Sequence, residues 1–532
     1  MINWAIHSSH DSSVTVKLAE NYYRIYELER FVNQRYYSLN IDPNGLEKFE
    51  NFVNYLKNQG IELSKEYYTL QHECPESQFL LDLHNKLGYE PVPSCSHFEA
   101  HAATSFFTSP FQEATCLAYD GGGFSKYGEF YYDFFKIFTA TRDGGIHDTG
   151  IMYKYNMGSC YLSMAEPIPE IRNKNNLGDF YRYGLSYAGK LMGLFSYGTV
   201  IKELENYFVD VFKKFNDDRV FSKPIDYLKY IPTWKDYFQN YPDFNSLTVE
   251  EGRNYAATVQ RAFEIVVLGV IYEHKDLFFG KNVTIGGGCA LNVQMNQRLR
   301  DLGIKTFVPP NPNDCGLSLG QFLYIDKPSE PVDVTYNGFD LIGNSNCLDK
   351  YKSTLISKID DIASIIMNKK IIGIVIASSE IGPRALGNRS MIASIEIEGI
   401  RDKVNKIKNR EPYRPIAISI LEEDARQYFY LNEGDSCEYM SYSPHVREEY
   451  LEIFRNVIHV DNSIRIQTVN QSQHPFLYEL LTFLKNKGRI PAVVNTSLNM
   501  KGRPIVTSYS EIAKLIEQLD GVYVNGIFYE NQ

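Results

Sequence analysis

The sequence lacks three features that mark nucleic-acid-binding, extracellular or membrane proteins: an excess of positive charge, paired cysteines and a long hydrophobic run. Its formal net charge is −11, which argues against a broad affinity for polyanions. The net charge is still compatible with a local basic groove. None of the 8 cysteines forms a CxxC pair. Reduced thiols in a cytoplasm fit this pattern better than a disulfide framework or a zinc site.

No stretch approaches the roughly 18–20 uninterrupted apolar residues that a membrane span requires. The first residues, MINWAIHSSHDSSV, do not join a basic region to a long apolar run, so they do not have the pattern of a signal peptide. We therefore expect a cytoplasmic protein that does not associate with a membrane.

The chain has 532 residues, of which 44% are hydrophobic, enough for a large core and more than one domain. A boundary is expected near residues 325–345, where prolines, charges and glycines separate two patterned regions. Both regions combine predicted strands with helices in a pattern typical of an α/β or α+β fold; we expect α/β, with domains at 1–340 and 341–532. In the second domain, the predicted strands are 371–377, 416–421 and 491–494, and the predicted helices are 354–370, 475–487 and 509–519.

Two glycine-rich turns in the N-terminal part have the pattern of an anion site. One interrupts a predicted hairpin over 115–138, and the other joins a strand to a helix at 285–292. Glycines let backbone N–H groups approach a phosphate, and a helix start adds positive potential. The residues assigned to a nucleotide on this pattern are Asp120, Gly121, Gly122, Gly123, Gly286, Gly287, Gly288 and Asn292. A tight hairpin turn remains the simpler interpretation of the first.

A third polar turn, HDSS at 10–13, contains His10 and Asp11 between two predicted strands. Three such turns in one domain resemble the actin-like ATPase plan, in which two related halves hold a nucleotide.

His97 and His101 lie one helical turn apart in SHFEAHAATSFF. This spacing puts both imidazoles on one helix face, where they can share a metal ion. Asp314, in a Pro/Asn-rich loop, is the candidate third ligand. Such a set suits iron, manganese or another borderline divalent ion better than calcium. Two ordinary histidines are the alternative.

Cationic and polar side chains gather in three C-terminal segments, in SSEIGPRALGNRS, IKNREPYRP and NTSLN. The cationic side chains are Arg384, Arg389, Lys408, Arg410 and Arg414, and the polar ones are Thr496, Ser497 and Asn499. Basic side chains supply charge and forked donors for phosphate or carboxylate, while hydroxyl and amide groups fix orientation. A solvated helix end and a polar loop are the alternatives for the last two segments.

Taken together, these motifs resemble the O-carbamoyltransferase family that includes the tobramycin, cephalosporin and nodulation-factor enzymes. The similarity runs along nearly the whole chain through HDSS (10–13), HFEAH (97–101), YDGGG (119–123), AGKLMGL (188–194), GGGCALN (286–292), NDCGLSLG (313–320), GPRALGNRS (382–390), IKNREPYRP (407–415), RIQTV (465–469) and NTSLN (495–499). The resemblance implies an actin-like (ASKHA) N-terminal transferase domain and a YrdC-like C-terminal domain.

The resemblance also implies a two-step reaction. Carbamoyl phosphate and ATP, with its Mg(II), would give carbamoyl-adenylate in the C-terminal domain, and the N-terminal domain would pass the carbamoyl group to a hydroxyl. Lys408, Arg410, Ser497 and Asn499 match the family's KxR…SxN pattern, and Arg384 matches an arginine of its GPRALG signature. By the same resemblance, His97, His101 and Asp314 match its metal ligands, with Fe(II) as the favoured ion.

His10, beside Asp11, is the candidate for accepting the hydroxyl proton because an imidazole pKa lies near neutrality. A nucleotide-contacting role for this turn stays open.

The acceptor is also open. Antibiotics, sugars and hydroxymethylated nucleosides, nucleotides or DNA bases all carry a suitable hydroxyl. A homodimer is an open alternative to a monomer. The family pattern usually has a glutamate where this chain has Arg503, and a different lead-in where it has Ser378 and Ser379; both departures suggest a divergent branch. The alternatives are a tRNA threonylcarbamoyl transferase-like enzyme, which the acidic charge disfavours, and a non-catalytic nucleotide-binding scaffold.

Overall fold

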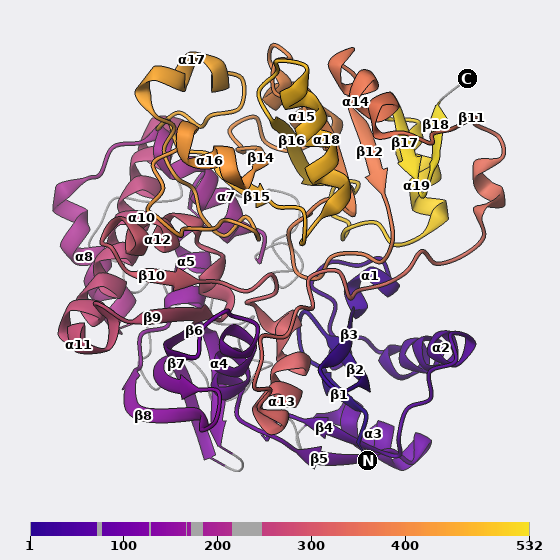
Figure 1. Cartoon of the computed structure of the whole chain (residues 1–532). Helices are drawn as coiled ribbons and strands as arrows, with labels where there is room; N and C mark the ends of the chain where they lie inside the picture. Colours follow the sequence, from indigo (N-terminus) through magenta and orange to yellow (C-terminus); the bar gives the residue numbers. More distant parts are fainter. Residues whose placement is uncertain are drawn as a thin grey trace. The chain divides into compact units, whose positions relative to one another are not determined.

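The computed structural model describes residues 2–71, 77–126, 129–165, 167–171, 185–214 and 247–530 (Figure 1). These residues form a mixed α/β fold with three sheets. Each sheet contains both parallel and antiparallel strand pairs. The α/β expectation is therefore confirmed.

The chain forms two compact units. The first comprises Met1–Asn21, Tyr36–Met295 and Asp301–Val332, and the second comprises Tyr22–Arg35, Asn296–Arg300 and Asp333–Gln532. An N-terminal segment, Tyr22–Arg35, thus belongs to the same unit as the C-terminal part of the chain.

The two sheets of the first unit repeat one strand arrangement. In one sheet, β1 (Trp4–His7) pairs antiparallel with β2 (Ser13–Ala19) and parallel with β4 (Glu66–Thr69), and β4 pairs parallel with β5 (Glu90–Pro93). In the other, β6 (Glu113–Lys126) pairs antiparallel with β7 (Glu129–Thr141) and parallel with β9 (Asn282–Gly286), and β9 pairs parallel with β10 (Lys305–Phe307). The orders β2-β1-β4-β5 and β7-β6-β9-β10 therefore correspond strand by strand. Strand β8 (Gly145–Tyr153) lies beyond β7 in the second sheet.

The helices of the first unit include two that carry or adjoin candidate site residues, α4 (His97–Phe107) and α13 (Leu317–Asp326). The described part of this unit also contains α2 (Gly45–Asn58), α3 (Gln78–Leu87), α5 (Met157–Ala165), α7 (Tyr187–Leu194), α8 (Lys202–Lys214), α10 (Val249–Glu273) and α11 (Lys275–Phe278). Helix α12 (Val293–Asp301) follows the second glycine turn and contributes Asn296–Arg300 to the second unit.

Among the described residues, α10 is the one helix that is long and apolar enough to cross a membrane, judged by length and composition. However, 67% of its apolar stretch is buried inside the protein, as in a core helix. A capping box between Thr248 and Glu251 fixes where it begins.

The second unit contains an eight-stranded sheet in the order β11-β18-β17-β12-β13-β16-β14-β15. These strands are β11 (Lys352–Leu355), β12 (Ile372–Val375), β13 (Arg389–Ser394), β14 (Ala417–Leu421), β15 (Arg465–Val469), β16 (Ala492–Ser497), β17 (Gly521–Val524) and β18 (Ile527–Glu530). The accompanying helices are α14 (Ile359–Met367), α15 (Ile400–Ile407), α16 (Glu422–Tyr428), α17 (Leu451–Phe454), α18 (Pro475–Asn486) and α19 (Tyr509–Ile516), and the N-terminal segment adds β3 (Tyr22–Glu27) and α1 (Leu28–Phe31). Leucines and isoleucines of α14 and α18 form one buried core with the strands.

The strands and two of the helices predicted in this unit are confirmed, with small differences in length. The helix predicted over 354–370 is wrong at its start, because α14 begins at Ile359. The preceding residues form β11, which pairs antiparallel with β18. This pairing partner is distant in sequence, so the local pattern did not reveal it.

Candidate metal centre and cationic cluster

The two predicted metal ligands of α4 lie side by side at the helix start. The Ser96 side chain caps the helix by accepting the Glu99 N–H, and the Glu99 carboxylate accepts the Ser96 N–H. His97 and His101 are 3% and 1% exposed, and their Nε2 atoms are 3.1 Å apart. The prediction that both imidazoles lie on one face of the helix is therefore confirmed.

Two aspartates complete a four-residue group, named here the His/Asp cluster: His97, His101, Asp120 and Asp314. Asp120 Oδ2 lies 3.1 Å from His101 Nε2 and 3.7 Å from His97 Nε2. Asp314 Oδ1 lies 3.4 Å and 3.8 Å from the same two atoms. The sequence patterns assigned Asp120 to a phosphate-binding turn, whereas its carboxylate points toward the histidines.

The four side chains fit a divalent cation. Metal bonds of about 2.0–2.2 Å place neighbouring ligand atoms about 3–3.5 Å apart, close to the separations observed here. Two imidazole nitrogens and two carboxylates form a donor set that iron, manganese or zinc accepts more readily than calcium.

Without a cation, protons must balance the buried carboxylates. Burial favours a low pKa for His101, but hydrogen bonds to Asp120 and Asp314 raise that pKa to about 9. Burial also opposes ionisation of Asp120, yet the two histidines hold its pKa well below the ordinary value. A bound metal ion would replace these protons.

The HDSS turn lies against Asp314. His10 Nε2 is 3.4 Å from Asp314 Oδ2, and His10 Nδ1 is 3.4 Å from Asp11 Oδ2. Asn313 Nδ2 donates to Asp11 Oδ2 over 3.3 Å. His7, which the sequence patterns did not single out, also approaches Asp314 Oδ2, at 3.7 Å. Its position at the end of β1, three residues before His10, was the available signal.

The glycine turn after β9 meets Asp120, whereas the turn predicted at 120–123 is wrong, because these residues lie within strand β6. Gly288 N donates to Asp120 Oδ2 over 2.9 Å, and Gly121, Gly122 and Gly123 continue strand β6. Gly287 has a φ of +92°, and a Cβ there would lie 2.1 Å from Tyr119 O, so only glycine fits.

Gly286 ends strand β9, and the Asn292 side chain lies at the start of the helix that follows. Its Oδ1 accepts the Met295 N–H over 3.1 Å, and its Nδ2 donates to Gln260 Oε1 over 3.1 Å.

In the second unit, Lys408 follows α15 and reaches the end of β16. Its ammonium donates to Asn499 Oδ1 over 2.6 Å, to Ser497 Oγ over 3.1 Å, and to the Ser497 carbonyl. Thr496 precedes Ser497 in the strand, so its side chain points to the opposite face of the sheet.

Arginines gather around this lysine. Burial and the charges of Arg384, Arg410 and Arg414 hold the pKa of Arg465 well below its ordinary value. Burial, followed by the charges of Arg410, Arg35 and Arg414, does the same to the pKa of Lys408. We name Arg384, Lys408, Arg410, Arg414 and Arg465 the cationic cluster. Neither Arg465 nor Arg35 was assigned from sequence, although Arg465 opens the quoted RIQTV strand.

Arg389 has a different environment. It is fully buried, and its guanidinium donates to the carbonyls of Ile376, Ala377 and Asn388 over 2.6–2.9 Å. These bonds close the base of the loop that contains Arg384, and Arg389 is not among the charges that act on Arg465.

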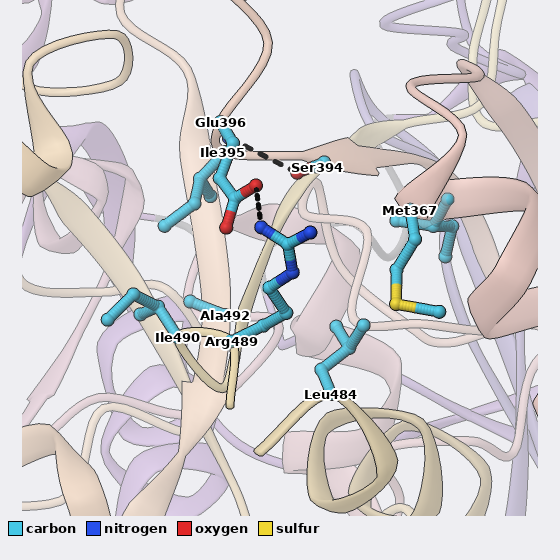
Figure 2. A pocket seen from close by; sticks show the side chains of 9 residues that line it. Met367, Ser394, Ile395, Glu396, Leu484, Arg489, Ile490 and Ala492 are labelled. Atoms are coloured by element: carbon cyan, nitrogen blue, oxygen red, sulfur yellow. Dashed lines mark hydrogen bonds and ion pairs between the residues drawn. The ribbon is translucent and has the colours of Figure 1, made fainter. Parts of the chain in front are cut away.

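A small hollow in the second unit has a different lining, which includes Ser394, Glu396, Arg489 and Ala492 (Figure 2). Arg489 and Glu396 form an ion pair of 2.9 Å within this lining. Ser394 and Ala492 stand at the ends of β13 and β16 opposite to Arg389 and Ser497, so the hollow is not part of the cationic cluster.

Two known protein families match most of the chain. The carbamoyltransferase N-terminus family matches residues 10–323, and the carbamoyltransferase C-terminus family matches residues 363–531. The chain belongs to the carbamoyltransferase family. It is therefore an enzyme that transfers a carbamoyl group, and the resemblance drawn from its motifs is confirmed.

Named relatives agree with this assignment. Nodulation protein NolO of Bradyrhizobium diazoefficiens is 30% identical to this carbamoyltransferase over 457 residues, which is 81% of this chain and 77% of the relative. Nodulation protein U of Rhizobium tropici is 25% identical over 468 residues, 84% of this chain and 76% of the relative. Among solved structures, HypF of T. kodakarensis covers 61% of this chain and 48% of its own at 14% identity with a TM-score of 0.33, too low to bear on the fold.

Proposed function

We propose that this carbamoyltransferase is an ATP-dependent O-carbamoyltransferase that works in two steps. Residues 341–532 activate the carbamoyl group as carbamoyl-adenylate, and residues 1–340 transfer it to an acceptor hydroxyl. A carbamate is a poor electrophile because its nitrogen donates into the carbonyl, so transfer requires a leaving group such as AMP.

In the activation step, water releases inorganic phosphate from carbamoyl phosphate, and the resulting carbamate oxygen attacks the α-phosphorus of ATP. The bond between the α-phosphorus and the bridging oxygen breaks, and pyrophosphate leaves with its Mg(II). This step brings two anions together, and the cationic cluster is suited to offset their repulsion.

One observation carries this proposal: Lys408 is held by Ser497 and Asn499 among several arginines. A buried lysine surrounded by arginines is costly in an empty site. The cost falls when a polyanion such as ATP occupies the site, because each positive charge then has a negative partner. We assign Arg384, Arg410 and Arg414 to the same anions, and Arg389 to the loop that presents Arg384.

In the transfer step, the acceptor oxygen attacks the carbamoyl carbon, the bond from that carbon to the AMP oxygen breaks, and the acceptor proton leaves. Burial lowers the pKa of His10, but the neighbouring Asp314 and Asp11 carboxylates raise it to about 10. His10 is our candidate for taking that proton once a bound cation offsets these carboxylates. The His/Asp cluster would hold the divalent ion, proposed to be Fe(II), which supplies Lewis-acid stabilisation of negative charge. The glycines that follow Asp120 in β6 and the glycine turn after β9 would contact the adenylate.

The repeated strand order β2-β1-β4-β5 and β7-β6-β9-β10 supports an actin-like plan for the transferase domain, since that plan has two related halves. The YrdC-like assignment of the second domain rests on its KxR…SxN and GPRALG motifs. The cysteines among the described residues are all free, which agrees with a cytoplasmic location.

The experiment measures pyrophosphate release from ATP with and without carbamoyl phosphate. Wild-type enzyme should release pyrophosphate only when carbamoyl phosphate is present, and Lys408→Met should abolish the release. His97→Ala should retain release but lose carbamoyl transfer to a panel of aminoglycosides, sugars and hydroxymethylated nucleosides, monitored by mass spectrometry. Transfer by His97→Ala at the wild-type rate would refute the metal assignment, and an inactive wild type would refute the function.

A further inference from the structure

Two charged residues of the N-terminal segment Tyr22–Arg35 are buried within the second unit. Glu27 ends β3 and is 5% exposed, and Arg30 of α1 is 3% exposed. Arg30 Nε lies 2.5 Å from Glu27 Oε2. The pair therefore forms one buried ionic group contributed by a part of the chain far in sequence from the cationic cluster.

This pair binds the backbone of the loop that carries Arg384. Arg30 Nη1 donates to the Glu380 carbonyl over 2.5 Å, and Arg30 Nη2 donates to the Gly382 carbonyl over 2.6 Å. Glu27 Oε1 accepts the Gly382 N–H over 2.7 Å. One guanidinium and one carboxylate thus fix three backbone groups within three consecutive residues.

The rest of the loop is held from the other side. Glu380 Oε1 accepts the N–H groups of Leu386 and Arg389 over 2.6 and 3.3 Å. At the tip, Pro383 is exposed and Arg384 is half-buried, whereas the residues on either side are buried. The loop is therefore rigid at its base and presents Arg384 at its tip.

Stability alone does not account for such a pair. Burying an ion pair removes two charges from water, and apolar side chains of similar size often stabilise a fold equally well. A planar guanidinium instead fixes geometry, because its donors engage two acceptors in set directions. Gly382 has a φ of +83°, and both of its backbone groups are bound by the pair, so the pair defines the turn immediately before Arg384.

The same segment is also connected to Lys408 through hydrogen bonds. Arg503 Nη1 donates to the Asn33 carbonyl over 2.8 Å. The Arg503 carbonyl accepts from Asn499 Nδ2 over 2.6 Å, and Asn499 Oδ1 accepts from Lys408. Residues 27–33 therefore make contacts that lead to both Arg384 and Lys408.

We propose that Glu27 and Arg30 are positioning residues for carbamoyl activation, which hold the turn from which Arg384 reaches the bound anion. The inference rests on the proposed function of the second domain, and it extends that domain's working parts to a segment in the first 35 residues.

The test is a double-mutant cycle on pyrophosphate release. Arg30→Lys keeps the charge but loses the fork that spans the Glu380 and Gly382 carbonyls. It should lower kcat/KM about 10- to 100-fold, because a displacement near 1 Å at a reacting site has an effect of that size. In an Arg384→Ala background, Arg30→Lys should cause no further loss, since its effect passes through Arg384.

One control and one replacement variant separate an effect on positioning from an effect on folding. Arg142→Lys changes another buried arginine, which donates to the Ser109 carbonyl over 2.6 Å in the first unit, and should leave pyrophosphate release unchanged. If Arg30→Lys does not fold, Glu27→Gln replaces it, because an amide oxygen can still accept the Gly382 N–H but does not balance the Arg30 charge.

Equal losses from Arg30→Lys in the wild-type and Arg384→Ala backgrounds would overturn the inference, as would an unchanged kcat/KM in a folded Arg30→Lys enzyme. Either result leaves the proposed function intact, because wild-type enzyme would still release pyrophosphate. Absence of release in wild type would instead refute the proposed function.

Discussion

At the scale of single residues, the GPRALGNRS loop contains two arginines with opposite environments. Arg384 is half-buried at the loop tip and adds its charge to that around Arg465. Arg389 is fully buried and binds three backbone carbonyls. The two side chains are five residues apart, so they form a natural comparison between an anion contact and a structural bond.

The first prediction compares Arg389→Met with Arg384→Ala. Arg389→Met leaves buried carbonyls without donors, so the free energy of unfolding should fall by about 3 kcal/mol. Arg384→Ala should lower that free energy much less, by about 0.5 kcal/mol, because the half-buried side chain lies at the loop tip and not in the core, while strongly reducing pyrophosphate release. Urea unfolding and the pyrophosphate assay measure the two effects. A stable Arg389→Met enzyme with impaired anion binding would instead make Arg389 an anion ligand.

The second prediction concerns the protonation of Lys408. Burial and neighbouring arginines lower its pKa in the free site, and a bound polyanion should raise that pKa again. Binding of ATP should therefore take up a proton, and ATP affinity should weaken as pH rises above the lowered pKa of the free site. Isothermal titration calorimetry in buffers of different ionisation enthalpy measures the uptake. Lys408→Met should abolish it, and an unchanged uptake in that variant would assign the proton to another group.

At the scale of elements, the turn after β9 joins two parts of the His/Asp cluster. Gly287 N donates to the Pro312 carbonyl over 2.8 Å, two residues before Asp314, and Gly288 N donates to Asp120 Oδ2. A single glycine turn thus fixes the loop that carries one aspartate and the side chain of the other.

The third prediction follows from this turn. Gly287→Ala should reduce metal content and lower the free energy of unfolding by about 3 kcal/mol, because its Cβ would collide with the Tyr119 carbonyl. Gly303→Ala is the matched control: Gly303 has a φ of +78° with nothing within 4 Å, so only backbone strain of about 1 kcal/mol should appear, with metal content unchanged. Metal analysis and thermal unfolding decide between them, and full metal content in Gly287→Ala would contradict the role of the turn.

Sequence patterns predicted these elements better than the contacts between them. The HDSS turn, the antiparallel strand pair over 115–138 and the strand–turn–helix at 285–292 are present, whereas the glycine turn predicted at 120–123 is part of a strand. The position of Asp120 against His101 could not be predicted, because it depends on the pairing of Ala118 with Gly286 across two distant strands. An aspartate before glycines has the same sequence pattern whether it faces a phosphate or a metal ion.

At the scale of the whole molecule, the chain passes between its two compact units more than once. Tyr22–Arg35 belongs to the second unit although its neighbours on both sides belong to the first. No composition change marks this segment, because membership in a unit is decided by tertiary contacts such as those of Arg30 with Glu380 and Gly382. For the same reason, the sequence showed Arg384 and Arg389 only as similar arginines.

The fourth prediction is that metal removal separates the two reactions. The His/Asp cluster lies in the first unit and Lys408 in the second. Dialysis against a chelator, followed by assay with fresh Mg(II), should therefore eliminate carbamoyl transfer but preserve pyrophosphate release. Iron(II) should restore transfer. Loss of both activities, restored together by iron(II), would show that the metal ion serves activation as well.

The most direct test of the central claim is to identify the nucleotide product formed from ATP labelled in its α-phosphate. Purified wild-type enzyme, given carbamoyl phosphate and Mg(II), should convert ATP to AMP and pyrophosphate in equal amounts, with no conversion when carbamoyl phosphate is omitted or Lys408 is replaced by Met. Formation of ADP and phosphate, or of AMP without carbamoyl phosphate, would contradict activation through carbamoyl-adenylate.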